Sequence, residues 1–142
     1  MTEVEFHTGV ADKLGFACRL LRKAYRKGAL VVVIGPAPLL GQLDRELWTF
    51  ETEDFIPHLR LPAGEVLPAS AQRTPIWLVD GVPPVGAPPV VINLGAAALA
   101  DLAPFERLIE VLSDSAEDVE DGRQRWRDYR DRGLAVVHHP AR

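Results

Sequence analysis

Hydrophobic and polar positions follow two different periods along the chain, and each change of period predicts an element of secondary structure. Residues 4–7 alternate one by one, as in a strand, and Thr8-Gly9 is expected to end it. From Asp12 to Lys27 the apolar residues return every three or four positions, which predicts a helix with Asp12 as its N-cap. The β-branched run 30–34 that follows is typical of a strand buried on both faces of a parallel sheet.

The rest of the chain continues this alternation of strand and helix. The further elements that the pattern predicts are a helix over 38–48, strands over 75–79 and 90–93, a strand or short helix over 105–112, a helix from Ser115 to Gly133, and a strand over 134–137. Ser115 is expected to open the last helix, with Asp118 completing an S-x-x-D capping box. Strands that alternate with helices predict an α/β fold. We expect a single domain, residues 1–142, with a mostly parallel central sheet flanked by helices in a Rossmann-like, P-loop-like topology.

Composition and charge narrow the class of protein. The 142 residues are 47% hydrophobic and 25% charged, as in one folded domain, and the net charge of −4 argues against a general nucleic-acid coat. The one cysteine, Cys18, cannot form an internal disulfide, and its place on the apolar side of a helix predicts a core position. The chain starts without a signal-peptide pattern and its longest apolar run is short for a membrane span, which predicts a soluble, cytoplasmic protein.

The segment Gly35–Gln42 follows the buried strand, where many α/β proteins bind phosphate. A P-loop requires G-x-x-x-x-G-K-[ST], but here five residues separate Gly35 from Gly41, and Gln42 and Leu43 replace the lysine and the hydroxyl. Two prolines in the segment also remove backbone donors that a phosphate needs. The segment is therefore interpreted as a turn without a functional P-loop. A degenerate, P-loop-like nucleotide-binding protein is the alternative.

No catalytic or metal-binding motif stands out in the sequence. The four histidines include no pair at the i, i+4 spacing of a helical zinc site, and His138 and His139 point to opposite faces of the expected last strand. Neither a nucleophile elbow nor a dinucleotide-binding glycine loop is found. The sequence thus predicts no catalytic residue, no metal site and no cofactor.

The last helix carries arginines beside an indole ring along one edge of its helical wheel, whereas Tyr129 turns inward. The residues on this edge are Arg123, Trp126, Arg127 and Arg130. Guanidinium groups bind carboxylates in a forked geometry, and an exposed aromatic ring can bury an apolar group. The pattern therefore favours a binding site for an acidic peptide with an apolar end. A solvated amphipathic helix is the alternative interpretation.

A second group of aromatic residues lies around the end of the helix over 38–48. Trp48, Phe50, Phe55 and Pro57 are close in sequence, and Trp48 falls outside the apolar face of that helix. Such residues form an exposed apolar patch of the kind that binds a partner, or else a small satellite core under the proline-rich loops.

These two segments carry a family resemblance. The motifs are Leu43-Asp44-x-x-Leu47-Trp48, Phe55-x-Pro57-His58, and Arg123-x-Arg125-Trp126-Arg127-x-Tyr129-Arg130-x-x-Gly133. In this order and spacing, with the opening Phe6 strand and the Cys18 helix, the sequence resembles the chi subunit of bacterial DNA polymerase III. The resemblance extends over nearly the whole chain and is weakest in 62–89.

The resemblance implies an α/β fold without a P-loop and an accessory role without polymerase chemistry. Members of the family link the clamp-loader complex to the acidic, phenylalanine-ending tail of single-stranded DNA-binding protein. By position, this role falls on Arg123 and Trp126, with Arg127 and Arg130 as neighbours. Some members carry a contributing lysine one turn earlier, where this chain has Val119.

A second partner in the family is the psi subunit, and the positions that match its contact surface are Trp48, Phe55 and Pro57. The resemblance therefore implies a protein-binding adaptor whose partners are the tail and psi or another clamp-loader subunit. Weak binding of single-stranded DNA by the same arginines and Trp126 is a further alternative.

Overall fold

The computed structural model describes residues 1–49 and 55–141, which form seven strands, three α-helices and one 3₁₀ turn. In chain order they are β1 (Glu3–Val10), α1 (Lys13–Arg26), β2 (Val31–Ile34), α2 (Ala37–Thr49), β3 (His58–Leu61), η1 (Ala69–Ala71), β4 (Ile76–Val79), β5 (Val90–Asn93), β6 (Arg107–Ser113), α3 (Ala116–Asp131) and β7 (Val136–Pro140). Each predicted helix is present. The segment 105–112, for which a strand or a short helix was predicted, forms the strand β6.

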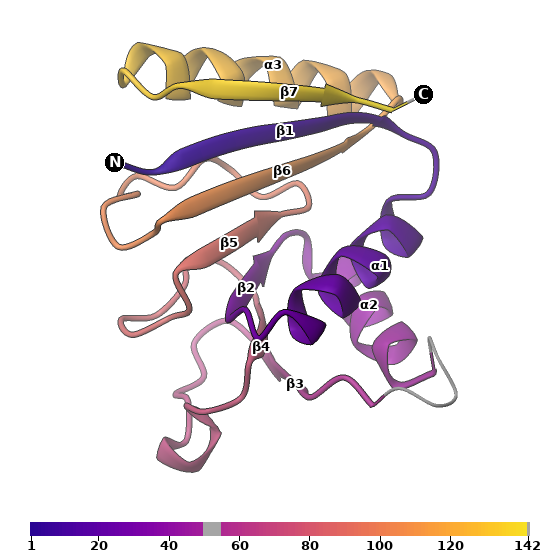
Figure 1. Cartoon of the computed structure of the whole chain (residues 1–142), viewed down its shortest axis with the longest axis vertical. Coiled ribbons are helices and arrows are strands. Elements are labelled where there is room, and N and C mark those ends of the chain that lie inside the picture. The colour runs from indigo at the N-terminus through magenta and orange to yellow at the C-terminus, as the bar shows by residue number, and fades with distance from the viewer. Residues whose placement is uncertain (50–54, 142) are drawn as a thin grey trace.

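The seven strands form one parallel sheet in the order β3-β4-β2-β5-β6-β1-β7. Figure 1 shows β3 and β7 at the two edges, with the first strand inserted between β6 and the last strand. The predicted α/β fold with a parallel central sheet is therefore confirmed. The prediction that Thr8-Gly9 ends the first strand is wrong, because β1 continues to Val10 through a register irregularity after His7.

The helices cover the two faces of the sheet unequally. Alternate residues of β2 show this, since Val31 and Val33 pack into the core beneath α1 and α2, whereas Val32 and Ile34 face the core beneath α3. The α3 side is completed by the segment that precedes β6, through Leu99, Leu102 and Phe105. Burial on both faces explains why β2 reads as an unbroken apolar run.

Two local predictions from the first half of the chain can be compared with the fold. Cys18 is 1% exposed in the core beneath α1, and burial, the largest cause, raises the pKa of its thiol to about 11. The interpretation of Gly35–Gln42 as a turn holds only for Gly35 and Pro36, which separate β2 from α2, because residues 37–42, Gly41 included, belong to the helix. The glycines of this segment therefore do not enclose a phosphate-binding loop. No helix among residues 1–49 and 55–141 is long and apolar enough to cross a membrane.

Candidate functional site

The start of α3 is fixed to the end of β6 and to α1. The Ser115 hydroxyl accepts a hydrogen bond from the Asp118 backbone N–H at 3.2 Å, as expected of an N-cap. The Asp118 carboxylate accepts at 2.8 Å from the Ser113 backbone N–H and at 2.8 Å from Lys13 Nζ. Burial alone would raise the pKa of Asp118, but these hydrogen bonds outweigh it and lower the pKa. The predicted cap is confirmed at Ser115, while Asp118 connects three elements instead of closing a capping box.

A buried polar cluster sets the rotation of α3 about its own axis. Glu110 of β6 is fully buried and accepts hydrogen bonds from Arg125 Nε at 3.0 Å, from the Tyr129 hydroxyl at 2.7 Å and from Asn93 Nδ2 at 3.1 Å. Burial raises the pKa of the Glu110 carboxyl, but all three neighbours donate to it, which is the arrangement of a carboxylate. Because Arg125 and Tyr129 both point at Glu110, the helix presents one fixed edge to solvent.

Gly122 lets α3 approach the sheet closely. A Cβ atom at this position would lie 2.3 Å from Leu112 Cδ1, a distance that real Cβ contacts do not reach. The absence of a side chain therefore sets the depth to which α3 sits on β6, next to the hollow described below.

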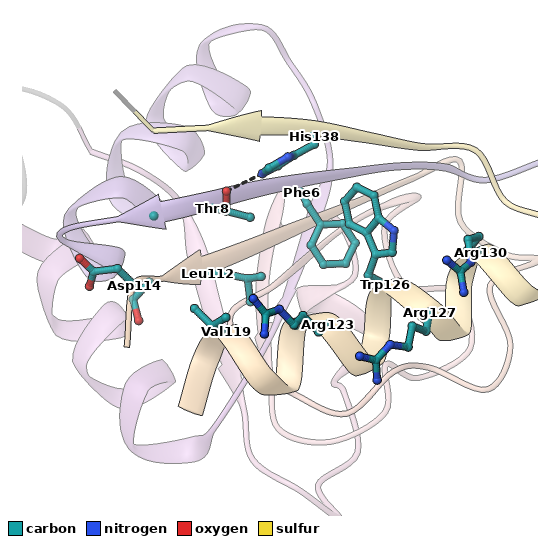
Figure 2. A pocket seen from close by; sticks show the side chains of 13 residues that line it. Phe6, Thr8, Leu112, Asp114, Val119, Arg123, Trp126, Arg127, Arg130 and His138 are labelled. Carbon is teal, nitrogen blue, oxygen red and sulfur yellow. Dashed lines mark hydrogen bonds between the residues drawn. The ribbon is translucent and has the colours of Figure 1, made fainter. Parts of the chain in front are cut away.

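Beside α3 lies a hollow of about 580 Å³ between the helix and strands β1, β6 and β7. Figure 2 shows the Phe6 and Trp126 rings side by side within it, and their centroids are 5.0 Å apart. His138 of β7 stands edge-on to Trp126 at 5.8 Å and is hydrogen-bonded to the Thr8 hydroxyl at 2.6 Å. We call this hollow the α3 groove; its lining residues are Phe6, Thr8, Gly9, Leu112, Ser113, Asp114, Val119, Gly122, Arg123, Trp126, Arg127, Arg130 and His138.

The sequence-predicted arginines lie on the border of the α3 groove. Arg123, Arg127 and Arg130 are exposed and Trp126 is half-buried, so all four predicted residues line one site. Among the described residues, Arg123 and Arg127 have no carboxylate within ion-pair distance, and Arg130 has only the exposed Asp131 at 3.7 Å. The groove thus combines an apolar interior with cationic groups that are available to a ligand. Asp114 is the one acidic residue in the lining.

The second predicted surface lies at the other side of the molecule, where α2 ends and β3 begins. Trp48 is 56% exposed and Phe55 is 63% exposed, with their ring centroids 5.5 Å apart, and Pro57 is half-buried beside them. Trp48 also contacts the buried His58 ring at 4.7 Å. We call Trp48, Phe55 and Pro57 the Trp48 patch. Its two large rings are exposed rather than part of a satellite core, and Phe50 lies outside the described residues.

The comparison with protein families decides where this chain belongs. The family model of the DNA polymerase III chi subunit, HolC, matches residues 1–137. The chain belongs to the chi subunit family. A relative in Pseudomonas aeruginosa, named DNA polymerase III subunit chi, is 30% identical over 144 residues, which cover 98% of this chain and 96% of the relative. As a chi-family chain it is an accessory subunit of the DNA replication machinery.

Solved structures of low sequence identity share the fold of this chi-family chain. The C-terminal domain of the DEAD-box protein Dbp5 superposes with a TM-score of 0.60 at 12% identity, over 99% of this chain and 90% of that one. The C-terminal domain of S. cerevisiae Dbp5 bound to Gle1 and IP6 gives a TM-score of 0.57 at 12% identity over the same shares. At this identity the likeness establishes the fold alone.

Two groups of residues that form the α3 groove were not predicted from the sequence: the buried pair beneath it and the residues of its strand side. Arg125 and Glu110 form the buried pair, and Phe6 and His138 supply the strand side of the hollow. Two signals were present: Glu110 is a single acid within the apolar run 108–112, and Arg125 is a single cation on the inward side of its helix. A buried charge needs a partner, so each residue predicts the other.

Proposed function

We propose that this chi-family chain is a non-catalytic adaptor. Its α3 groove binds the acidic, phenylalanine-ending tail of single-stranded DNA-binding protein, and its Trp48 patch binds the clamp-loader complex. The observation that carries the proposal is that one hollow combines the Phe6–Trp126 ring surface with the guanidinium groups of Arg123 and Arg127, which have no ion-pair partner among residues 1–49 and 55–141.

The groove suits both parts of such a tail. An aromatic side chain at the end of the peptide is expected to bury its ring against Phe6 and Trp126, where ring pairs gain more than area burial alone. The terminal carboxylate and preceding acidic side chains are expected to pair with Arg123, since guanidinium forks bind carboxylates in a bidentate geometry. Val119 contributes apolar surface where some family members place a lysine, and Arg127 and Arg130 supply charge on later turns.

The positions of the two surfaces support a linking role. The Trp48 patch lies beside β3, at one edge of the sheet, and the α3 groove lies beside β7, at the opposite edge. Figure 1 shows these strands as the two extremes of the sheet, so a ligand in the groove leaves the patch uncovered. The exposed Trp48–Phe55 pair matches the chemistry of interface centres, where aromatic side chains dominate the binding energy. We assign this patch to psi or another clamp-loader subunit.

The experiment that tests the groove is fluorescence anisotropy of a labelled acidic peptide ending in Pro-Phe, titrated with the chain. We expect saturable micromolar binding that Trp126→Ala abolishes and Trp48→Ala leaves unchanged. Because Trp126 packs on Phe6, the exposed Arg123→Ala serves as a second variant that does not disturb the core.

Two controls identify what is recognised. The same peptide with a C-terminal amide should bind more weakly, since it lacks the terminal carboxylate. Unlabelled single-stranded oligothymidylate should fail to displace the peptide. No binding at low salt, or equal binding by both groove variants and the unaltered chain, would refute the proposal, and displacement by the oligonucleotide would favour direct DNA binding.

A further inference from the structure

The pairing of the first and last strands places three ligand-type side chains together on the sheet face opposite the α3 groove. His7 of β1 and His139 of β7 are direct register partners, and their rings stack at 4.9 Å with an interplanar angle of 21°. Glu5 lies two residues before His7 and so on the same face of β1. The neighbouring His138 points to the other face, where it lines the groove.

The donor atoms of these three residues lie close to one another. Nε2 of His7 lies 3.0 Å from Oε2 of Glu5, and Nε2 of His139 lies 3.6 Å from the same oxygen. All three donor atoms lie within 4.8 Å of one another. A tetrahedral zinc ion with bonds of about 2.1 Å holds its ligand atoms about 3.4 Å apart, which lies between these two distances. The half-exposed His139 can rotate to bring its nitrogen closer to that of His7.

The surroundings of this cluster resemble the supporting contacts of a metal site. Arg107 Nε donates to the other oxygen of Glu5, Oε1, at 2.6 Å, which orients the carboxylate and leaves Oε2 toward the histidines. The Phe16 ring of α1 packs at 5.4 Å from the His7 ring and limits its movement. Contacts of this kind orient the direct ligands in known metal proteins. An adjoining hollow of about 610 Å³, lined in part by Glu5, Arg107 and His139, gives access from solvent.

We propose that Glu5, His7 and His139 bind a divalent transition-metal ion through two imidazole nitrogens and one carboxylate oxygen. This donor set suits Zn²⁺ and leaves a fourth position open to water or a further ligand. The ion would tie β7 to β1, because its ligands come from both strands. The helical i, i+4 spacing used in the sequence search does not detect such a site, since the ligands meet only through strand pairing.

The test is isothermal titration calorimetry with ZnCl₂ on chain that carries no affinity tag and has been stripped with a chelator. We expect one site of micromolar affinity, weakened at least about tenfold in His139→Gln, because losing even a supporting residue of a metal site costs that much. His138→Gln is the matched control, since it alters the next residue of the same strand on the opposite face. The control should bind Zn²⁺ as the unaltered chain does.

Two further readouts keep the proposal testable if a variant folds poorly. The unaltered chain should show the visible absorption of four-coordinate Co²⁺ when cobalt is added, and Zn²⁺ should raise its Tm in a manner that a chelator reverses. The absence of binding heat and of a Tm shift in the unaltered chain would overturn the proposal. Equal affinity in His139→Gln and the unaltered chain would do the same and would leave the three residues as an ion-pair cluster.

Discussion

The α3 groove and the Trp48 patch are both proposed protein-binding surfaces, yet they differ in shape and in charge. The groove is hollow, contains the Phe6–Trp126 ring pair, and is bordered by arginines that have no carboxylate partner among the described residues except the exposed Asp131. The three residues of the patch are uncharged, and the rings of Trp48 and Phe55 are exposed. We therefore expect a charge-dependent site and an apolar site at opposite edges of the sheet. Partners at the two surfaces should therefore respond differently to salt.

The two surfaces also differ in what lies beneath them. Beneath the groove, the fully buried Glu110 forms an ion pair with Arg125 of α3. The patch stands on His58, whose Nε2 lies 2.9 Å from Asp44 Oδ1, a carboxylate with 31% of its side chain exposed. Removing one member of a fully buried charge pair leaves the other charge uncompensated, whereas an ion pair with a partly exposed carboxylate is screened by water and contributes less.

The largest expected effect is therefore on folding, from Glu110→Gln. This change leaves the Arg125 charge buried without a counterion, and we expect the free energy of unfolding to fall by about 3–5 kcal/mol. Asp44→Asn, the equivalent change beneath the patch, should cost only about 1 kcal/mol. Urea unfolding followed by circular dichroism measures both. Similar decreases in the free energy of unfolding of the two variants would show that the two ion pairs contribute equally to stability.

The next effect is on binding at the groove. Arg123→Ala removes a charge-assisted hydrogen bond worth about 1.5–3 kcal/mol, so we expect the affinity for the acidic peptide to fall at least about tenfold. Arg73→Ala is the matched control, because Arg73 is an exposed arginine outside the groove. Anisotropy titrations of both variants decide the matter. An unchanged affinity in Arg123→Ala would remove that residue from the site.

The fold class and the inward face of α3 could both be predicted, because both depend on local sequence signals. The unbroken apolar run of β2, the N-caps Asp12 and Ser115, and the inward position of Tyr129 are all visible within a few residues of sequence. These signals depend on backbone geometry and on the burial of one face, which the local pattern carries.

The strand side of the groove could not be predicted, because it depends on which strands become neighbours. Phe6 and His138 meet Trp126 only when β1 lies between β6 and β7, and no local pattern encodes that order. The same long-range pairing brings His7 to His139. What sequence patterns supplied was one wall of the site, the helix, and the structure supplied the other.

A smaller effect separates the two surfaces by their response to salt. Raising NaCl from about 0.1 M to about 1 M shortens the screening length from about 10 Å to about 3 Å, so peptide binding in the groove should weaken several-fold. Association at the Trp48 patch should hold or strengthen slightly, because apolar burial is not screened. Parallel titrations with the peptide and with a clamp-loader preparation test this contrast. Equal salt dependence at both surfaces would contradict it.

The smallest expected effect concerns the anchor of α3 and its dependence on pH. The folded state lowers the pKa of Asp118 below its usual value of 3.8, so the stabilisation is present above that pH and is lost as the pH falls through the lowered pKa. Asp118→Asn should therefore reduce stability by about 1 kcal/mol near neutral pH, and the difference from the unaltered chain should vanish in strong acid. Urea unfolding at a series of pH values measures it, and a difference that does not shrink as the pH falls below 3.8 would contradict this origin.

The place of β1 between β6 and β7 also governs when these surfaces come into being as the ribosome makes the chain. The hydrogen bond between Thr8 and His138 can form only after His138, 130 residues later in the chain, has been synthesised. Until β7 emerges, β1 keeps an open edge, and β3, β4, β2 and β5 can pair without it. The Trp48 patch therefore lies beside strands whose pairing requires neither β1 nor β7. The groove and the His7–His139 pair are completed by the final strand, so a nascent chain can offer the first surface before it can offer the second.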